Sequence, residues 1–273
     1  MRNTTANKGL RTAARGGGGR EVTARCGLVA RGVLYALIGL LALRVAFGDG
    51  GQEADRQGAL QELAEKPFGI VLIWTIGIGL VGMMLWRLSE AVFGAAGPDG
   101  GKATKRLASA GRTVFYAVVA FSVLAFAVGR GGSSGDQQSR DVTAKALDLP
   151  AGQWLVGAAG LGIAIAGVVI AVQAARRHFR KHLSMTGVSQ GVRKAVTFVG
   201  VAGGLARGAV FTAVGGFIVY AAVRYDPSQA KGMDDTLRSF TQTAVGPWLL
   251  VAVALGLMLF GVFSWAMARW REV

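Results

Sequence analysis

The chain has 273 residues, of which 52% are hydrophobic and 16% are charged, and its net charge is +15. Soluble domains carry about a quarter charged residues, so this composition excludes an ordinary soluble fold. The single cysteine, Cys26, excludes an intramolecular disulfide.

The first 24 residues precede all apolar segments and hold five basic residues and one acidic residue. They offer too little apolar surface to form a core, so we expect residues 1–24 to be a disordered basic arm. Anionic lipid attracts such an arm by about 1 kcal/mol for each base near the membrane surface.

Six apolar segments, each nearly free of charge, then follow one another along the chain. They cover residues 32–43, 69–86, 113–129, 151–175, 195–223 and 246–268. A bilayer core of about 30 Å needs roughly 20 helical residues, so the segments predict an all-α integral membrane protein with six transmembrane helices. The first segment is short and spans a membrane only if its helix begins earlier, near Ala24, and Arg44 extends outward. A cleaved signal peptide is the alternative for this segment, but no convincing small-residue cleavage site accompanies it.

Three stretches share one register: ARGVLYALIG (30–39), GRTVFYAVVA (111–120) and ARGAVFTAVG (206–215). The alignment pairs an arginine with an aromatic residue four positions later: Arg31 with Tyr35, Arg112 with Tyr116, and Arg207 with Phe211. Each copy holds an opening helix, a loop rich in acids and a second helix. Because each copy crosses the membrane twice, we expect three parallel-oriented helical hairpins in a pseudo-threefold bundle, unlike the inverted repeats of many transporters.

This repeat divides the chain into six parts. They are the arm (1–24), repeat 1 (25–93), a linker (94–105), repeat 2 (106–175), a basic linker (176–194) and repeat 3 (195–270). The second helices share small residues at matching positions: Gly77 and Gly79, Gly160 and Gly162, and Ala254 and Gly256. Small residues let helix backbones approach closely in lipid, so we expect these positions at helix–helix contacts.

The first copy contains ARGVLYALIGLLAL, GALQELAEKPFG and GIGLVGMMLWRLSEA. These stretches resemble the repeat of the bacterial membrane-protein family catalogued as domain of unknown function 1206, over about residues 25 to 270. The resemblance implies tandem two-helix units in a bacterial membrane and no particular activity. The later copies depart from the first: Thr113 and Phe211 replace the glycine and the tyrosine, and Glu90 becomes Gln173 and then Met267.

Charge is distributed unevenly between the two sides of the predicted bundle. The side with both termini and the loops between repeats holds 21 of the 30 lysines and arginines but only four of the 15 acids. This positive-inside bias predicts a bacterial cytoplasmic (inner) membrane protein with the N- and C-termini in the cytoplasm. The positive charge is thus a topology signal, and we do not expect nucleic acid as a partner.

Two hypotheses explain the repeated arginines. In the first, they anchor helix ends and extend to lipid phosphates. In the second, Arg31, Arg112 and Arg207 face inward as a ring near the cytoplasmic surface, with Tyr35 and Tyr116 one helical turn deeper as cation–π partners. Such a ring would bind an anionic lipid headgroup. A separate alternative for copy 1 is that Glu90 neutralises Arg31, which would leave unpaired charge only in copies 2 and 3. Arg207 favours the second hypothesis, because 12 uncharged residues precede it.

Enzymatic function is not expected. The chain contains no HExxH, GxSxG or Walker pattern, and the acids of the predicted outer loops fit a solvated face. His178 and His182 are one helical turn apart, but surrounding bases oppose a metal ion, so we expect no metal and no cofactor.

The sequence favours a scaffold or accessory protein with a lipid site. The alternative is a channel or transporter along the pseudo-threefold axis. The mid-span residues Leu37, Val118 and Ala213 are apolar, which favours a plug over a pore. Substrate, protein partners and oligomeric state are left open.

Overall fold

The computed structural model describes residues 4–48, 53–94, 102–130, 134–185, 187–240 and 246–270. Its long helices are α1 (Thr4–Ala46), α3 (Gly69–Phe93), α4 (Ala103–Ala127), α6 (Gly152–Ala175), α7 (Gln190–Arg224) and α9 (Gly246–Trp270). Short helices connect them: α2 (Arg56–Ala64), α5 (Gly135–Leu147), α8 (Met233–Phe240), and the 3-10 turns η1 (His178–His182) and η2 (Pro227–Gln229). Most of the predicted linker 94–105, and residues 241–245 before α9, lie outside the described residues.

Each long helix contains a segment long and apolar enough to cross a membrane, which confirms the prediction of six spans. The span of α1 begins at Ala24, the point from which the short first segment must extend. Residues 4–24 are helical in the structure and not disordered as expected, because α1 begins at Thr4 and continues through them. Extending an existing helix adds one hydrogen bond for each residue fixed and avoids the nucleation cost, so a polar stretch can continue an apolar span.

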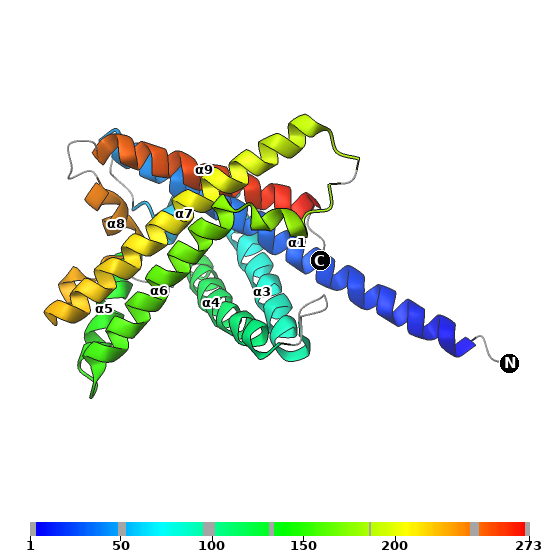
Figure 1. Cartoon of the computed structure of the whole chain (residues 1–273), viewed down its shortest axis with the longest axis horizontal. Coiled ribbons are helices and arrows are strands. Elements are labelled where there is room, and N and C mark those ends of the chain that lie inside the picture. The colour runs from blue at the N-terminus through cyan, green and yellow to red at the C-terminus, as the bar shows by residue number, and fades with distance from the viewer. Residues whose placement is uncertain are drawn as a thin grey trace.

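The six long helices pack in a cyclic order. The second helix of each repeat lies along the opening helix of the next, in the pairs α3–α4, α6–α7 and α9–α1 (Figure 1). This is the order that a pseudo-threefold bundle requires. Within a repeat, α1 packs on α3 and α7 on α9, but α4 and α6 do not pack along each other in the part of the chain that the structure describes. Repeat 2 is therefore the open repeat.

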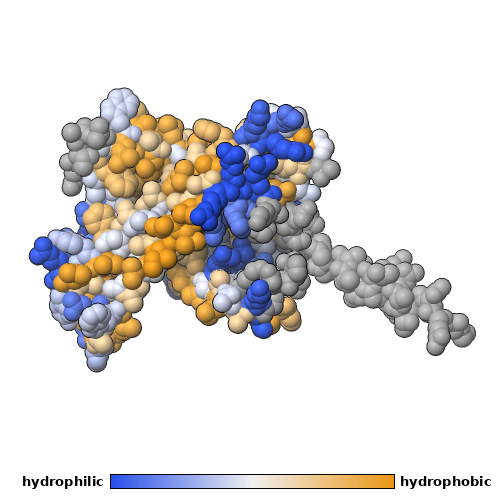
Figure 2. Space-filling view, viewed as in Figure 1, coloured by the Kyte–Doolittle hydropathy of each residue, from blue (hydrophilic) through white to orange (hydrophobic). Residues whose placement is uncertain are grey.

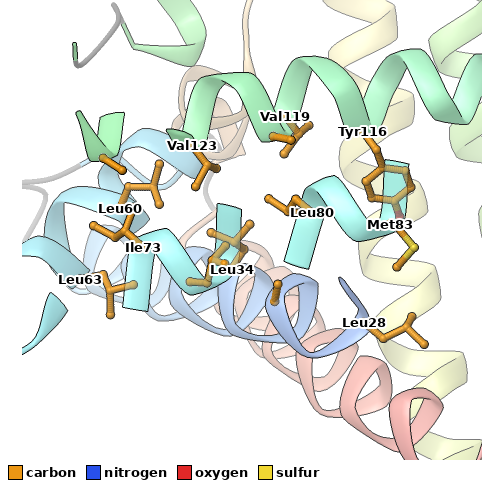
Figure 3. Packing of buried hydrophobic residues seen from close by; sticks show 14 of the residues in the cluster. Leu28, Leu34, Leu60, Leu63, Ile73, Leu80, Met83, Tyr116, Val119 and Val123 are labelled. Atoms are coloured by element: carbon orange, nitrogen blue, oxygen red, sulfur yellow. The ribbon is translucent and has the colours of Figure 1, made fainter. Parts of the chain in front are cut away.

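One of the buried hydrophobic clusters joins repeat 1 to repeat 2, and another joins repeat 1 to repeat 3. Leu28 and Leu34 of α1, Leu80 and Met83 of α3, and Tyr116, Val119 and Val123 of α4 belong to one buried cluster, which Figure 3 shows with Leu60, Leu63 and Ile73. On the outer surface, apolar residues cover much of the visible face, and hydrophilic residues gather near η1 and the first turns of α7 (Figure 2). An apolar surface of this extent fits a bilayer environment.

Glycines set the closest approaches between repeats. A Cβ at Gly208 of α7 would lie 2.7 Å from the Gly167 carbonyl oxygen of α6, and a Cβ at Gly261 of α9 would lie 2.7 Å from the Gly32 carbonyl oxygen of α1. Gly32 and Gly208 directly follow the aligned arginines. The opening helix therefore packs against the preceding repeat through the residue beside its arginine, and only a residue without a side chain allows this distance.

Five of the six small residues at matching positions in the second helices also lie at helix contacts. They are Gly77, Gly79, Gly160, Ala254 and Gly256. The sixth, Gly162, has open space where a side chain would extend. The packing prediction is therefore wrong at Gly162, because none of the described segments packs against this side of α6.

Candidate functional site

All three opening helices turn the same face toward a shared cavity of about 730 Å³. The residues four and seven positions after each aligned arginine line it: Tyr35 and Ile38 in α1, Tyr116 and Val119 in α4, and Phe211 and Val214 in α7. Positions separated by three or four residues lie on one face of a helix, so the repeated register becomes a repeated lining. The expected mid-span residues Leu37, Val118 and Ala213 are one position away from this face and do not line the cavity.

Two of the aligned arginines, Arg31 and Arg207, line the cavity. We call the end of the bundle where the span of α1 begins and α9 ends the terminal end. Both guanidiniums stand against the ring of Phe260 in α9, with distances from Cζ to the ring centroid of 5.1 Å and 5.0 Å. The two Cζ atoms are therefore at most 10.1 Å apart, the sum of these two distances. Both guanidiniums therefore lie in the same part of the cavity.

Aromatic rings surround the Arg207 guanidinium. Its Cζ lies 5.5 Å from the centroid of Tyr35 and 5.2 Å from that of Phe211, in addition to Phe260. The buried Tyr116 side chain lies beside Arg31 and within electrostatic reach of Arg207. The tyrosines expected one turn deeper therefore lie near the arginine pair, Tyr35 against Arg207 and Tyr116 beside Arg31. The cation–π contact of Arg31 itself, however, is with Phe260 of α9. Cation–π contacts stabilise a charge that lies away from water.

Both arginines keep hydrogen-bonding capacity free. Arg31 donates from Nε to the Ser264 hydroxyl at 3.2 Å, but its Nη2 is buried without an acceptor, as is Nε of Arg207. Among the described residues, no carboxylate lies within ion-pair distance of either guanidinium. A buried charge without a counter-ion is costly in a membrane and marks a position that a ligand can satisfy.

The third arginine does not join this pair. Arg112 is exposed and does not line the cavity, although the tyrosine of its copy, Tyr116, does. The expected ring of three arginines is therefore a pair in the structure. Copy 2 differs because Thr113 stands where the other copies have glycine, and because α4 does not pack along the second helix of its own repeat.

Glu90 does not pair with Arg31. Its Oε2 accepts from Arg87 at 2.7 Å and from the Ser109 hydroxyl at 3.4 Å, and the Arg87 guanidinium lies 4.1 Å from the Trp86 ring centroid. Glu90 thus has a structural partner, but this partner is Arg87 on the same helix and not Arg31. Arg31 keeps its charge unneutralised.

The opposite end of the cavity, here called the capped end, carries an unexpected ring of hydrogen bonds between repeats. Asp234 accepts from the Ala54 amide at 2.7 Å, Asp55 accepts from the Gly135 amide at 2.9 Å, and Asp136 accepts from the Asp235 amide at 3.1 Å. Each repeat thus offers a buried carboxylate to the loop helix of another, in a closed cycle. Asp55 and Gly135 also line the cavity, so this aspartate ring closes it.

The aspartate ring contradicts the expectation that these acids form a solvated loop face. A signal was present in the sequence, since an aspartate stands beside the start of each loop helix: AD at 54–55, GD at 135–136 and DD at 234–235. Aspartate at such a position caps a helix, as Asp55 does by accepting from the Gly58 amide at 2.9 Å. Helix capping alone, however, does not predict the bond to another repeat.

Three carboxylates of the ring, those of Asp136, Asp234 and Asp235, have oxygens within 4.8 Å of one another and could hold a metal ion by position. Their bonds favour a structural role. Arg238 pairs with Asp234 at 2.7 Å, Arg140 pairs with Asp235, and backbone amides occupy one oxygen each of Asp136 and Asp234. Burial, followed by the charge of Asp235, raises the pKa of Asp136 to about 7.

A family model described as Domain of Unknown Function (DUF1206) matches the chain three times, at residues 26–94, 107–177 and 202–271. The chain belongs to this family. It is 31% identical over 242 residues to the uncharacterized protein YxxB of Bacillus subtilis strain 168, covering 88% of this chain and 87% of that protein. No solved structure matches the chain. The three matches confirm both the internal repeat, which was inferred from the aligned arginines, and the family resemblance of the first copy.

The three DUF1206 copies are therefore alike in fold and unequal in chemistry. Copies 1 and 3 supply the paired arginines, and copy 3 also supplies Phe260, whose ring contacts both of them. Copy 2 supplies Tyr116 and the open gap beside the cavity. Between the arginines and the aspartate ring, the lining is predominantly aliphatic. The arrangement suits an elongated ligand with an anionic end and an apolar body.

Proposed function

We propose that this DUF1206 protein is a non-enzymatic scaffold or accessory protein of the bacterial cytoplasmic membrane that binds an anionic lipid headgroup at Arg31 and Arg207. The observation that carries the proposal is the pair of guanidiniums with buried, unsatisfied nitrogens in the lining of a largely apolar cavity. A phosphate group offers several acceptor oxygens and a negative charge, which is what two such arginines lack.

The geometry also bears on the competing anchor hypothesis. An arginine that only anchors a helix extends its guanidinium to the membrane surface. Arg112, which is exposed, fits that description. Arg31 and Arg207 instead direct their guanidiniums inward onto Phe260. This orientation does not suit contact with the phosphates of the surrounding membrane surface. We assign anchoring to Arg112 and ligand binding to the other two.

The proposed orientation places the terminal end in the cytoplasm. The loops between repeats are rich in lysine and arginine, and the positive-inside bias places such loops in the cytoplasm. The six apolar spans separate these loops from the acidic loop helices on the other side. Arg31 and Arg112 lie 15 residues before the last residue of their helices, and Arg207 lies 17 residues before the last residue of α7. At 1.5 Å per residue they are about 22 to 26 Å from the capped end, near the inner boundary of a 30 Å core.

A channel or transporter is the second candidate, because the cavity lies among the three repeats, where the pseudo-threefold axis is expected. The lining favours binding over conduction. Ile38, Val119 and Val214 line the middle with aliphatic side chains, and the hydrogen bonds of the aspartate ring join the loop segments at the capped end. A conducting path needs polar or small residues at several depths.

Native mass spectrometry of the detergent-purified protein tests the proposed function. We expect wild type to retain anionic phospholipid through delipidation and the Arg31→Gln, Arg207→Gln double variant to lose it. Arg112→Gln is the matched control, since it removes an aligned arginine outside the cavity and should retain lipid. Equal retention by wild type and the double variant would overturn the headgroup site.

A further inference from the structure

The cavity is open toward the bilayer on one side, between α4 and α6. These two helices belong to the same repeat but do not pack along each other, unlike the helices of repeats 1 and 3. Three lining residues at this gap are exposed: Phe115 of α4 (47%), and Leu155 (56%) and Ala159 of α6. We call these three the portal rim.

Residues deeper in the same cavity are hidden from the outer surface. Ile38 of α1 and Leu80 of α3 line it but are only 5% and 1% exposed. A lipid in the layer around the protein can touch the portal rim, but it cannot touch Ile38 or Leu80 without entering. The cavity therefore offers a continuous apolar route from the bilayer to the interior, and the route begins at repeat 2.

We propose that an acyl chain of the bound lipid enters the cavity laterally through the portal rim and lies along Val119, Ile38 and Val214, while its anionic headgroup stays at the arginine pair. This inference rests on the proposed headgroup site and names the ligand class as an anionic phospholipid. Charge complementarity fixes which end of the lipid lies at Arg31 and Arg207.

The dimensions of the cavity fit one end of such a chain. Along α7 the lining runs from Arg207 to Ile218, which are 11 residues apart, or about 16 Å at 1.5 Å per residue. The lining over this length is aliphatic or aromatic in α1, α4 and α7. Polar side chains return only at the capped end, where Arg56 donates to the Ser122 hydroxyl at 3.0 Å. The part of the cavity between the arginine pair and the capped end is thus suited to hold an acyl chain.

Photolabelling in lipid nanodiscs tests the route. The probe is phosphatidylglycerol with a diazirine in one acyl chain, and the labelled residues are found by peptide mass spectrometry. We expect labels on the α1 segment containing Ile38, in addition to the exposed lipid-facing positions of α6. Labels confined to exposed positions would overturn the inference, because the surrounding lipid explains them.

A matched pair of substitutions isolates the portal. Ala159→Trp fills the rim, whereas Ala158→Trp adds the same ring at an adjacent exposed position that does not line the cavity. Ala159→Trp should remove most of the labelling near Ile38, and Ala158→Trp should leave it unchanged, with equal unfolding temperatures showing that both proteins fold. Equal interior labelling in the two variants would overturn entry at this gap.

The Arg31→Gln, Arg207→Gln double variant separates this inference from the proposed function. Loss of interior labelling in the double variant supports both, since the headgroup then holds the chain in place. If interior labelling persists without the arginines, the chain route stands and the headgroup site fails. If lipid retention requires the arginines but Ile38 is never labelled, the headgroup site stands and the chain route fails.

Discussion

Asp136 offers a test of the aspartate ring through pH. Its buried carboxyl faces Asp235, Asp234 and Asp55, and its pKa is raised from 3.8 to about 7, first by burial and then by the charge of Asp235. The folded protein therefore binds more protons than the unfolded chain between these two values. The free energy of unfolding should fall as pH rises from about 4 to about 7, and it should stay low above that.

The size of the effect follows from the same values. A rise from 3.8 to about 7 corresponds to at most about 4 kcal/mol. Water reaches the neighbouring Asp235 side chain, which is 27% exposed, so screening reduces the effect to roughly 1–2 kcal/mol. In a protein of this size, that stability difference shifts the midpoint of thermal unfolding by roughly 2–8 °C.

Asp136→Asn is the informative change, because it removes the charge and keeps a carbonyl oxygen to accept from the Asp235 amide. The variant should unfold at a higher temperature than wild type at pH 8.5, and the difference should vanish near pH 4. Asp141→Asn, at an exposed position of the same helix, should behave like wild type. Thermal unfolding followed by circular dichroism in detergent measures this. Parallel pH profiles for wild type and Asp136→Asn would refute the reasoning.

Two further predictions concern the contacts between repeats. Gly208→Leu should prevent correct packing of α7 on α6 and lower the yield of folded protein. Gly216→Leu is the control, because a side chain at Gly216 extends into open space and should leave the yield unchanged. Size-exclusion chromatography measures the yield of folded protein in both variants. Asp55→Ala leaves the Gly135 amide without its acceptor and should lower the free energy of unfolding by about 1–3 kcal/mol, measured by chemical denaturation. Asp141→Ala is the exposed control; an equal loss there would contradict a special role for the ring.

The architecture could be predicted because a bilayer imposes strong rules on sequence. Uncharged segments of about 20 residues must be helical spans, and a repeated register must repeat a packing arrangement. The same register located the cavity lining, since Tyr35, Tyr116 and Phe211 all face it. At mid-span the prediction was wrong by one position, since Ile38 and not Leu37 lines the cavity. With 3.6 residues per turn, the sequence alone does not decide which of two adjacent residues faces the cavity until the neighbouring helices are placed.

The inequality of the three copies could not be predicted. Arg112 is followed four residues later by a tyrosine, as Arg31 is, and the absence of packing between α4 and α6, which accompanies its exposure, cannot be deduced from that register. Phe260, which holds the two other arginines, belongs to a second helix more than 50 residues after Arg207, and nothing in its neighbourhood marks it. Likewise, the aspartate ring depends on bonds between residues such as Ala54 and Asp234, 180 positions apart.

The most direct test of the arginine site is headgroup selection in a mixed bilayer. Wild type and the Arg31→Gln, Arg207→Gln variant are reconstituted with equal amounts of phosphatidylglycerol and phosphatidylcholine of identical chains, and the ratio of the two lipids that stay bound is measured. At about 1 kcal/mol for each arginine, wild type should enrich the anionic lipid on the order of 30-fold, and the variant should return to the ratio of the bilayer. The same ratio in both proteins would contradict the account, and the paired arginines would then be structural.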